Sequence, residues 1–144
     1  MRLPDPVENP DFYDHLVAKR LLAWVIDLVV TLGLMLAVLI GTAFLAVFIF
    51  PFVWSAIAIA YRTVMLTRYG ATLGMMVASV QLRQLNGRAP TRELALTHSI
   101  LYAVSMVFVV PQIGSIAMMM LTPYRQGLND WILGTTVINK YLEY

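Results

Sequence analysis

Two charged side chains interrupt the first apolar stretch of the chain, "AKRLLAWVIDLVV", which runs from Ala18 to Val30. Arg20 stands near its start, and Asp27 follows seven residues later. On a helix this spacing returns both side chains to nearly the same face, about 10 Å apart along the axis. A carboxylate inside a membrane-spanning helix costs about 2.5–3.5 kcal/mol on insertion scales, and such residues commonly serve ion or proton pathways. Asp27 is therefore the first candidate for chemistry.

An ionised carboxylate in apolar surroundings needs a cation or a polar cavity, because otherwise it takes up a proton. At about 10 Å, Arg20 reaches Asp27 only if it bends inward or if a third group lies between them. Asp130, Arg62 and Arg125 are the candidates for that group. Two interpretations stay open: Asp27 binds a proton or ion along a path, or it forms a salt bridge that fixes helix packing.

The composition predicts an integral membrane protein. Of 144 residues, 60% are hydrophobic and only 12% are charged, about half the charged fraction of soluble domains. Residues 28–61 contain no charged side chain, and about 18 apolar residues already suffice for a membrane helix. The polar N-terminal tail, residues 1–15, lacks a signal-peptide pattern, so we expect the first span to be an uncleaved anchor. We expect residues 1–144 to form a single transmembrane domain.

The first two spans are expected to form a tight helical hairpin. Asn9 and Pro10 are typical of a helix start, so an interfacial helix is predicted to begin there and continue to about Ile40. Gly41 and Thr42 form the only plausible turn. One bent helix through residues 21–61 would instead reach about 60 Å, twice the thickness of a bilayer core.

The second helix is predicted from about Ala43 to Leu66, with a kink at Pro51, because proline removes one backbone hydrogen bond. Residues 94–121 form a third apolar segment, which "PQIG" at 111–114 is expected to break. This segment either crosses the membrane once or re-enters on the same side. Overall, the fold class is all-α, with interfacial amphipathic segments and at most a short strand pair.

The expected strand pair comes from a weak internal similarity. "VASVQLRQL" alternates like a strand, "NG" follows it as a tight-turn signal, and "GTTVIN" near the C-terminus is a second short strand. "TLGMMVASVQL" and "GLNDWILGTTVI" align so that Leu73 meets Leu128 and Met75 meets Asp130. Each would be a turn of helix followed by a strand, and the two strands could pair on one side of the membrane.

Basic residues predict the topology, because cytoplasmic loops carry an excess of Lys and Arg. They precede the first span at Arg2, Lys19 and Arg20 and follow the second at Arg62, Arg68, Arg83, Arg88 and Arg92. The N-terminus and the middle segment are therefore expected in the cytoplasm. A single third span would place the C-terminal tail outside, whereas a re-entrant pair would return it; the charges of the tail favour its return.

Three motifs together give the chain its resemblance: "AKRLLAWVID", "YGATLGMM" and "RQGLNDWILGTTVINK". In this order they resemble the RDD family of small prokaryotic membrane proteins, named for one arginine and two aspartates. Arg20, Asp27 and Asp130 correspond to those three residues. The "GxTLGK" box of the family corresponds to Gly70, Thr72, Leu73 and Gly74. The resemblance covers nearly all of the chain after residue 15.

Three positions depart from the family pattern. Met75 replaces the lysine after "TLG", Asn129 replaces the common histidine before the last aspartate, and His98 stands where many members have arginine. The resemblance implies a prokaryotic inner-membrane protein, with sodium–proton exchange or solute transport as the activity. His98 could titrate near neutral pH, although a lone histidine at the start of a span is more often an interface residue.

Several function classes are not expected. The net charge of +2 is too small to indicate nucleic acid, and the absence of cysteine excludes disulfides and thiolate chemistry. We find no motif for a phosphate loop, a zinc protease, a serine hydrolase or a glycosidase. We therefore expect no enzyme, no cofactor and no metal site. The partners expected are membrane lipids, with further copies of the chain or a larger membrane complex.

Two functions remain. In the first, a homo-oligomer exchanges cations for protons: Asp27 binds each in turn, Arg20 sets its affinity, and Asp130 completes one polar cluster. An oligomer is needed because a chain this small does not line a whole pathway. In the second, the chain is an accessory or scaffold subunit of a larger membrane complex, and the polar cluster holds its own helices together.

Overall fold

The computed structural model describes residues 3–140, so Arg2 of the basic set lies outside the described residues. The elements in chain order are η1 (Pro10–Tyr13), α1 (Leu16–Gly41), η2 (Leu45–Ile49), α2 (Phe50–Tyr69), α3 (Leu73–Val77), β1 (Val80–Gln84), α4 (Arg92–Met106), α5 (Val109–Leu121), α6 (Leu128–Leu133) and β2 (Thr135–Asn139). The prediction of a mainly helical membrane protein with a short strand pair is confirmed.

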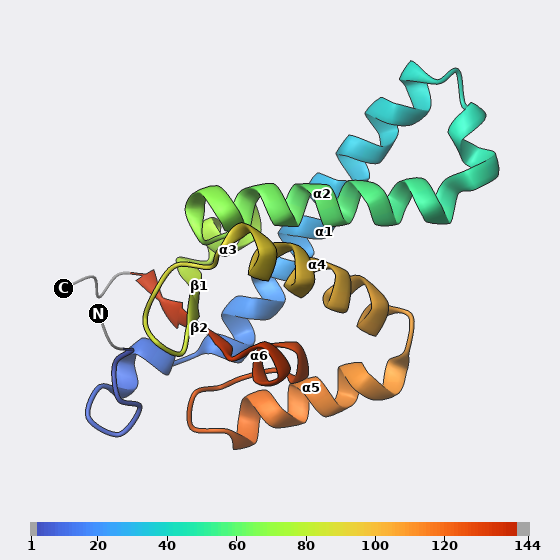
Figure 1. Ribbon diagram of the computed structural model, residues 1–144. Coiled ribbons are helices and arrows are strands. Elements are labelled where there is room, and N and C mark those ends of the chain that lie inside the picture. Colours follow the sequence, from blue (N-terminus) through green and yellow to red (C-terminus); the bar gives the residue numbers. More distant parts are fainter. Residues whose placement is uncertain (1–2, 141–144) are drawn as a thin grey trace.

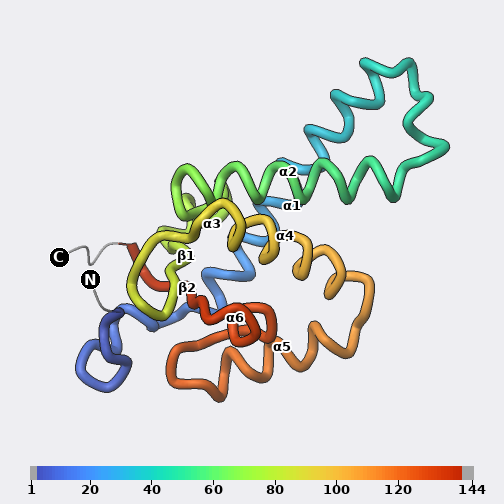
Figure 2. The backbone as a smooth tube through the Cα atoms, in the orientation of Figure 1, coloured from blue at the N-terminus to red at the C-terminus, as the bar shows by residue number. Residues whose placement is uncertain are grey.

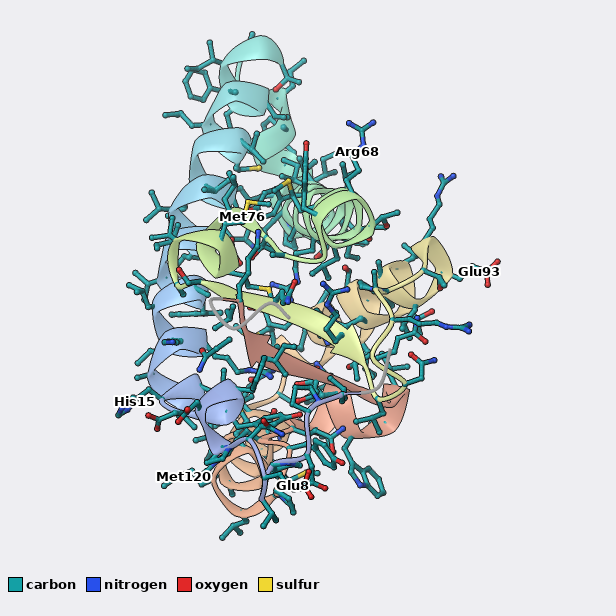
Figure 3. All side chains as sticks on the ribbon, turned by 90° about the vertical axis from the view of Figure 1, so that its left-hand side faces the viewer. Glu8, His15, Arg68, Met76, Glu93 and Met120 are labelled. Carbon is teal, nitrogen blue, oxygen red and sulfur yellow. The ribbon has the colours of Figure 1, made fainter. Side chains whose placement is uncertain are left out.

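Helices α1 and α2 form the predicted hairpin, whose closed end extends away from the rest of the molecule (Figure 1). α1 ends at Gly41, as expected, and Ala43 and Phe44 turn the chain with positive φ angles of 48° and 64°. The side chains at this end are apolar and exposed: Phe48 is 86% exposed and Phe52 is 78% exposed. Figure 3 shows them clear of the polar part of the molecule. This exposed apolar surface suits lipid rather than water.

Two details of the predicted hairpin are wrong. Pro51 does not kink the second helix; it lies in the first turn of α2, where its missing N–H would have no helical partner in any case. The chain bends before it, through the 3₁₀ turn η2. The N-terminal helix is not continuous either, because His15 has a positive φ of 54° and separates η1 from α1.

The two predicted strands exist and pair antiparallel. The register places Val80 opposite Asn139, Leu82 opposite Val137, and Gln84 opposite Thr135. α3 precedes β1 and α6 precedes β2, so both halves of the weak sequence similarity contain the expected turn of helix and strand. The ladder therefore brings the middle of the chain and its C-terminal part side by side (Figure 2).

The hydrophobic core lies around this ladder rather than inside the hairpin. Leu82 and Val137 contribute from the strands, and Leu16 and Leu66 from the ends of α1 and α2 nearest the sheet. Asn139 fastens the C-terminal strand to the N-terminal segment: its amide donates to the carbonyls of Asp11 and Asp14, and its Oδ1 accepts from Lys19 Nζ at 2.7 Å. The strand ladder, the N-terminal segment and the adjacent ends of α1 and α2 thus form one packed unit.

The third apolar segment is interrupted, as predicted, but at a different place. α4 and α5 are bent by 119° across a break at Val107 and Phe108, and Pro111 lies within the first turn of α5. Two helical stretches, Pro10–Gly41 and Leu45–Tyr69, are long and apolar enough to cross a membrane. The bent pair α4–α5 would be a third if it formed one span.

Candidate functional site

Asp27 lies in the middle of α1 and accepts hydrogen bonds from two other elements. Its Oδ1 accepts from the Tyr61 hydroxyl at 2.8 Å and from the Gly74 backbone N–H at 2.9 Å, and its Oδ2 accepts from the Thr72 hydroxyl at 2.6 Å. The nearest cation is Arg62, whose NH1 lies 3.8 Å from Oδ2. The carboxylate is therefore buried and well hydrogen-bonded, with a loose ion pair.

The start of α3 is built to receive this carboxylate. Thr72 is the N-cap residue, and its hydroxyl also accepts from the Met75 N–H. A free N–H at a helix start attracts negative charge, and Gly74 supplies one. Gly74 is also the point of closest approach to α1, because a Cβ there would overlap the Ala23 carbonyl and come within 2.9 Å of Asp27 Oδ1. The "TLG" motif thus places α3 against α1.

Arg62 is held on its other side by an aromatic ring. Its guanidinium carbon lies 4.1 Å from the centroid of the Tyr102 ring, a cation–π contact with α4. Among residues 3–140, the Nε of Arg62 and the hydroxyl of Thr63 are buried without a hydrogen-bond partner. Arg62 thus links Asp27 to α4, but not all of its donors are used.

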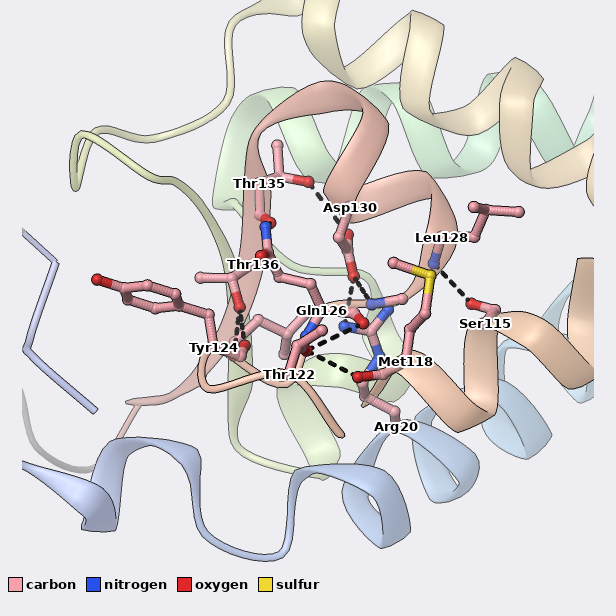
Figure 4. A network of polar contacts seen from close by, with 12 residues as sticks. Arg20, Ser115, Met118, Thr122, Tyr124, Gln126, Leu128, Asp130, Thr135 and Thr136 are labelled. Carbon is pink, nitrogen blue, oxygen red and sulfur yellow. Dashed lines mark hydrogen bonds and ion pairs between the residues drawn. The ribbon is translucent and has the colours of Figure 1, made fainter. Parts of the chain in front are cut away.

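Asp130 forms a second, tighter cluster (Figure 4). Its Oδ2 lies 2.7 Å from Arg20 NH1 and accepts from the Gly127 N–H at 3.2 Å. Its Oδ1 accepts from Thr135 at 3.1 Å and lies 2.9 Å from His98 Nε2. Because a carboxylate only accepts, Nε2 carries the proton in this contact. Asp130 is fully buried and joins α1, α4, α6 and β2.

Electrostatics keep Asp130 ionised. Burial alone raises the pKa of its carboxyl, but the charge of Arg20 and the His98 hydrogen bond together outweigh burial and hold that pKa below its usual value of 3.8. The Arg20–Asp130 pair therefore stays charged at any physiological pH, which suits a permanent structural contact and does not suit a group that must exchange protons.

This pKa shift predicts how stability depends on pH. A carboxyl with a lowered folded-state pKa contributes stability that is fully present above its unfolded value near 3.8 and is lost as pH falls through the folded value. We expect the difference in melting temperature between the native chain and Asp130→Asn in detergent to be constant from neutral pH to about pH 5. It should shrink only in stronger acid. A difference that already shrinks between pH 7 and 6 would contradict this.

The structure divides the predicted Arg20–Asp27–Asp130 cluster in two. Arg20 pairs with Asp130, and Arg62 is the cation of Asp27. The physical reason is that Arg20 and Asp27 are seven residues apart, about 10 Å along the axis of α1. Each of them therefore pairs with a charge that lies at the same height along the helix. Arg62 was among the candidates for this role, and Asp130 for the role beside Arg20. Asp130 also bonds the start of its own helix, because its Oδ2 accepts from the Gly127 N–H.

The secondary candidates differ in outcome. Thr72 and Gly74 belong to the Asp27 site, and His98 contacts Asp130 in the interior instead of lying at the interface. Gly70 ends α2 with a φ of 66°, and its carbonyl accepts from Leu82, so it positions the site from outside. Arg125 donates to the Met120 carbonyl and contacts neither carboxylate.

Sequence reasoning missed three side chains of the two sites. Tyr61 is the last residue of the charge-free stretch and directly precedes Arg62 on the same helix. Tyr102 lies inside the third apolar segment and contacts Arg62 through its ring. Thr135 follows Gly134 in "GTT", and only the tertiary fold brings its hydroxyl to Asp130. Polar atoms on aromatic side chains inside apolar segments were the signal for the first two.

The family comparison agrees with this arrangement. A model of the RDD family matches residues 16–134, which include Arg20, both aspartates and the whole "TLG" turn. No curated protein and no solved structure gives a significant match. With a match over most of its length, and with both aspartates and the arginine at the centre of the fold, the chain belongs to the RDD family.

Proposed function

We propose that this membrane protein exchanges a cation for a proton at Asp27. The observation that carries the proposal is the carboxylate of Asp27 within a span-length helix, with hydroxyl donors and a cation no closer than 3.8 Å. Intramembrane carboxylates are expensive and most often functional. Asp130 differs, because its ion pair with Arg20 is at 2.7 Å and its pKa is lowered. We therefore give Asp130 a structural role.

The depth of Asp27 supports this proposal. From Leu28 to the end of α1 at Gly41 the helix rises about 21 Å, less than the roughly 30 Å of a hydrocarbon core. A hairpin whose closed end reaches the far surface therefore places Asp27 and Arg62 inside the hydrocarbon region. At that depth the carboxylate of Asp27 would bind a proton or a cation inside the membrane.

The hydrogen bonds around Asp27 can serve both charge states. In the ionised state Thr72 donates its hydroxyl proton to Oδ2. When Oδ2 carries a proton, the hydroxyl rotates and accepts it, since a hydroxyl both donates and accepts. Loss of that proton restores a negative site in which a monovalent cation binds in place of the proton. Arg62, rather than Arg20 as the sequence predicted, would set the affinity.

A single chain of this size does not enclose a path across a bilayer, so the proposal includes a homo-oligomer whose copies supply the remaining walls. We place it in a prokaryotic cytoplasmic membrane with its N-terminus in the cytoplasm. The charged residues around the sheet support this orientation, because Arg83, Arg88 and Arg92 follow the second span.

The direct test is cation-driven proton movement in proteoliposomes with an internal pH dye. Asp27→Asn keeps the shape of the side chain but cannot ionise, so we expect the flux to fall about 100-fold or more, the scale of a lost proton-transfer group. Glu93→Gln, an exposed neutral substitution on α4, is the matched control and should keep the native flux. Equal melting temperatures confirm that both variants are folded. Unchanged flux in folded Asp27→Asn would refute the proposal.

One observation favours a second function, that of an accessory or scaffold subunit in a larger membrane complex. Both carboxylates are buried and bonded to several elements, as expected where polar groups only fix packing. Extraction in a mild detergent separates the two functions. A fixed partner at constant ratio, together with no flux from the pure protein, supports the scaffold; a self-oligomer with Asp27-dependent flux supports exchange.

A further inference from the structure

The chain consists of two halves with the same element order. α1, α2, α3 and β1 are followed by α4, α5, α6 and β2, so each half is a helical pair, a short helix and a strand (Figures 1 and 2). The contacts between halves agree with a two-fold relation: α2 packs on α4, and α5, the counterpart of α2, contacts α1, the counterpart of α4.

The backbone shows this relation residue by residue. Positive φ angles recur at Gly70 and Arg125, which follow the two helical pairs, and at Ser79 and Gly134, which precede the strands. The same 55 residues separate the members of each pair. Leu82 and Val137, again 55 apart, lie opposite each other at the centre of the ladder. A two-fold axis through that pair exchanges the halves, and Arg125, a non-glycine residue at positive φ, follows from the repeat.

The two helical pairs differ mainly in length. Asp27 accepts from the N–H of Gly74, 47 residues later. The residue equivalent to Gly74 is Asn129, whose side-chain Nδ2 donates to the Ser105 hydroxyl at 3.3 Å, only 24 residues earlier. Ser105 is thus the counterpart of Asp27. The second pair lacks 23 residues at its closed end, and this shortening begins at the level of Asp27.

Neither helix of the shortened pair is long enough to cross a bilayer by itself. α4 has 15 residues and α5 has 13, which gives about 22 Å and 20 Å of helix, against roughly 30 Å of hydrocarbon. The bend of 119° folds α5 back toward the sheet. α4 begins soon after β1, and α5 leads through α6 into β2. Because β1 pairs with β2, the start of α4 and the end of α5 both lie on the side of the strand ladder.

The closed end of this pair is apolar. Val107 is 75% exposed and Val110 is 80% exposed, with Phe108 and Val109 between them also exposed. No Asp, Glu, Lys or Arg occurs from residue 94 to residue 124. Such a charge-free exposed end fits the acyl chains of a membrane, and the helix lengths are too short to carry it to the far surface.

We propose that α4 and α5 form a half-membrane hairpin that inserts residues 107–110 into the acyl chains of the leaflet next to the sheet and then returns. The N-terminal segment, the middle segment and the C-terminal strand then share one side of the membrane. Only the α1–α2 hairpin penetrates deeper, and the two-fold repeat places the closed end of the short hairpin near the depth of Asp27.

Cysteine labelling tests this directly, because the chain contains no cysteine. Single variants Asn86→Cys, in the turn after β1, and Pro123→Cys, after α5, are treated with a membrane-impermeant maleimide in spheroplasts and in inverted vesicles. We expect both to react only from the same side, and the unsubstituted chain not to react. Labelling of Pro123→Cys from the opposite side would overturn the proposal; Thr122→Cys repeats the measurement if Pro123→Cys does not accumulate.

Phe108→Cys tests the depth of insertion. We expect no reaction with the impermeant maleimide from either side. After attachment of a fluorophore in detergent and reconstitution, lipids brominated on their acyl chains should quench it. Reaction from the far side would show a complete crossing, and reaction from the sheet side without quenching would show a surface position. Either result overturns the proposal.

Discussion

Replacing Asp130 by asparagine is expected to lower the free energy of unfolding by about 3–5 kcal/mol, the typical effect of removing one partner of a buried ion pair. Asparagine keeps the shape and still accepts from His98 or Thr135. It leaves the Arg20 guanidinium, whose side chain is 20% exposed, without its counter-charge. In detergent micelles this should appear as a drop in melting temperature of about 10 °C or more, measured by circular dichroism.

Asp11→Asn is the matched control, because Asp11 carries an exposed carboxylate in the N-terminal segment. Its melting temperature should stay close to that of the native chain. The double variant Arg20→Gln with Asp130→Asn should recover part of the loss, since no unpaired charge remains, and the cycle yields the coupling between the two residues. If Asp130→Asn melts at the native temperature, the pair does not stabilise the fold.

The residue pattern predicted the elements well because their signals are local. Charge-free runs, turn signals at Gly41 and at "NG", and alternation in "VASVQLRQL" each concern neighbouring residues. The positions predicted for the kink at Pro51 and the break at Pro111 were wrong for a physical reason. Proline stops a helix that is already running but is well tolerated in its first turn, and sequence alone did not show that the chain had turned just before each of them.

The pairing of charges was harder to predict because it depends on the level of each group on its helix. Arg20 and Asp27 share a face, which suggested one cluster, yet they lie about 10 Å apart along the axis. The partner at each level comes from a distant part of the chain: Asp130 from α6 and Arg62 from α2. A polar cluster is therefore not defined by the spacing on one helix.

The two clusters also explain why so small a chain keeps one arrangement. Apolar helix faces slide easily in lipid, because lipid gives no hydrophobic force for helix association. The Asp27 site joins α1 to α2 and α3, and the Asp130 site joins α1 to α4, α6 and β2. Each of these polar contacts fixes the position along α1 at which the other element packs. The two carboxylates differ in the distances to their arginines, 2.7 Å for Asp130 and 3.8 Å for Asp27.

Gly74→Ala should be the most damaging substitution that changes no polar group. The added Cβ would overlap the carbonyl oxygen of Ala23 and lie 2.8 Å from its carbon, and both atoms belong to the backbone of α1. A flexible side chain could move aside, whereas a helix backbone must shift as a whole. Overpacking typically costs about 1–3 kcal/mol. When α3 moves away from α1 to relieve the overlap, the hydrogen bond from the backbone N–H of residue 74 to Asp27 is lost as well, which adds about 1.5–3 kcal/mol, the usual value for a hydrogen bond to a charged group.

Gly33→Ala is the matched control for this substitution. Gly33 lies in the same helix as Ala23, and a Cβ there meets nothing within 4 Å, so alanine should leave stability unchanged or raise it by up to about 1 kcal/mol through helix propensity. Thermal unfolding of both variants in one detergent gives the comparison. A large loss for Gly74→Ala beside no loss for Gly33→Ala is expected only if α3 presses directly on α1. Equal melting temperatures would mean that α3 does not hold Asp27, and the exchange proposal would then lose two of the three hydrogen-bond donors to this carboxylate, Thr72 and Gly74.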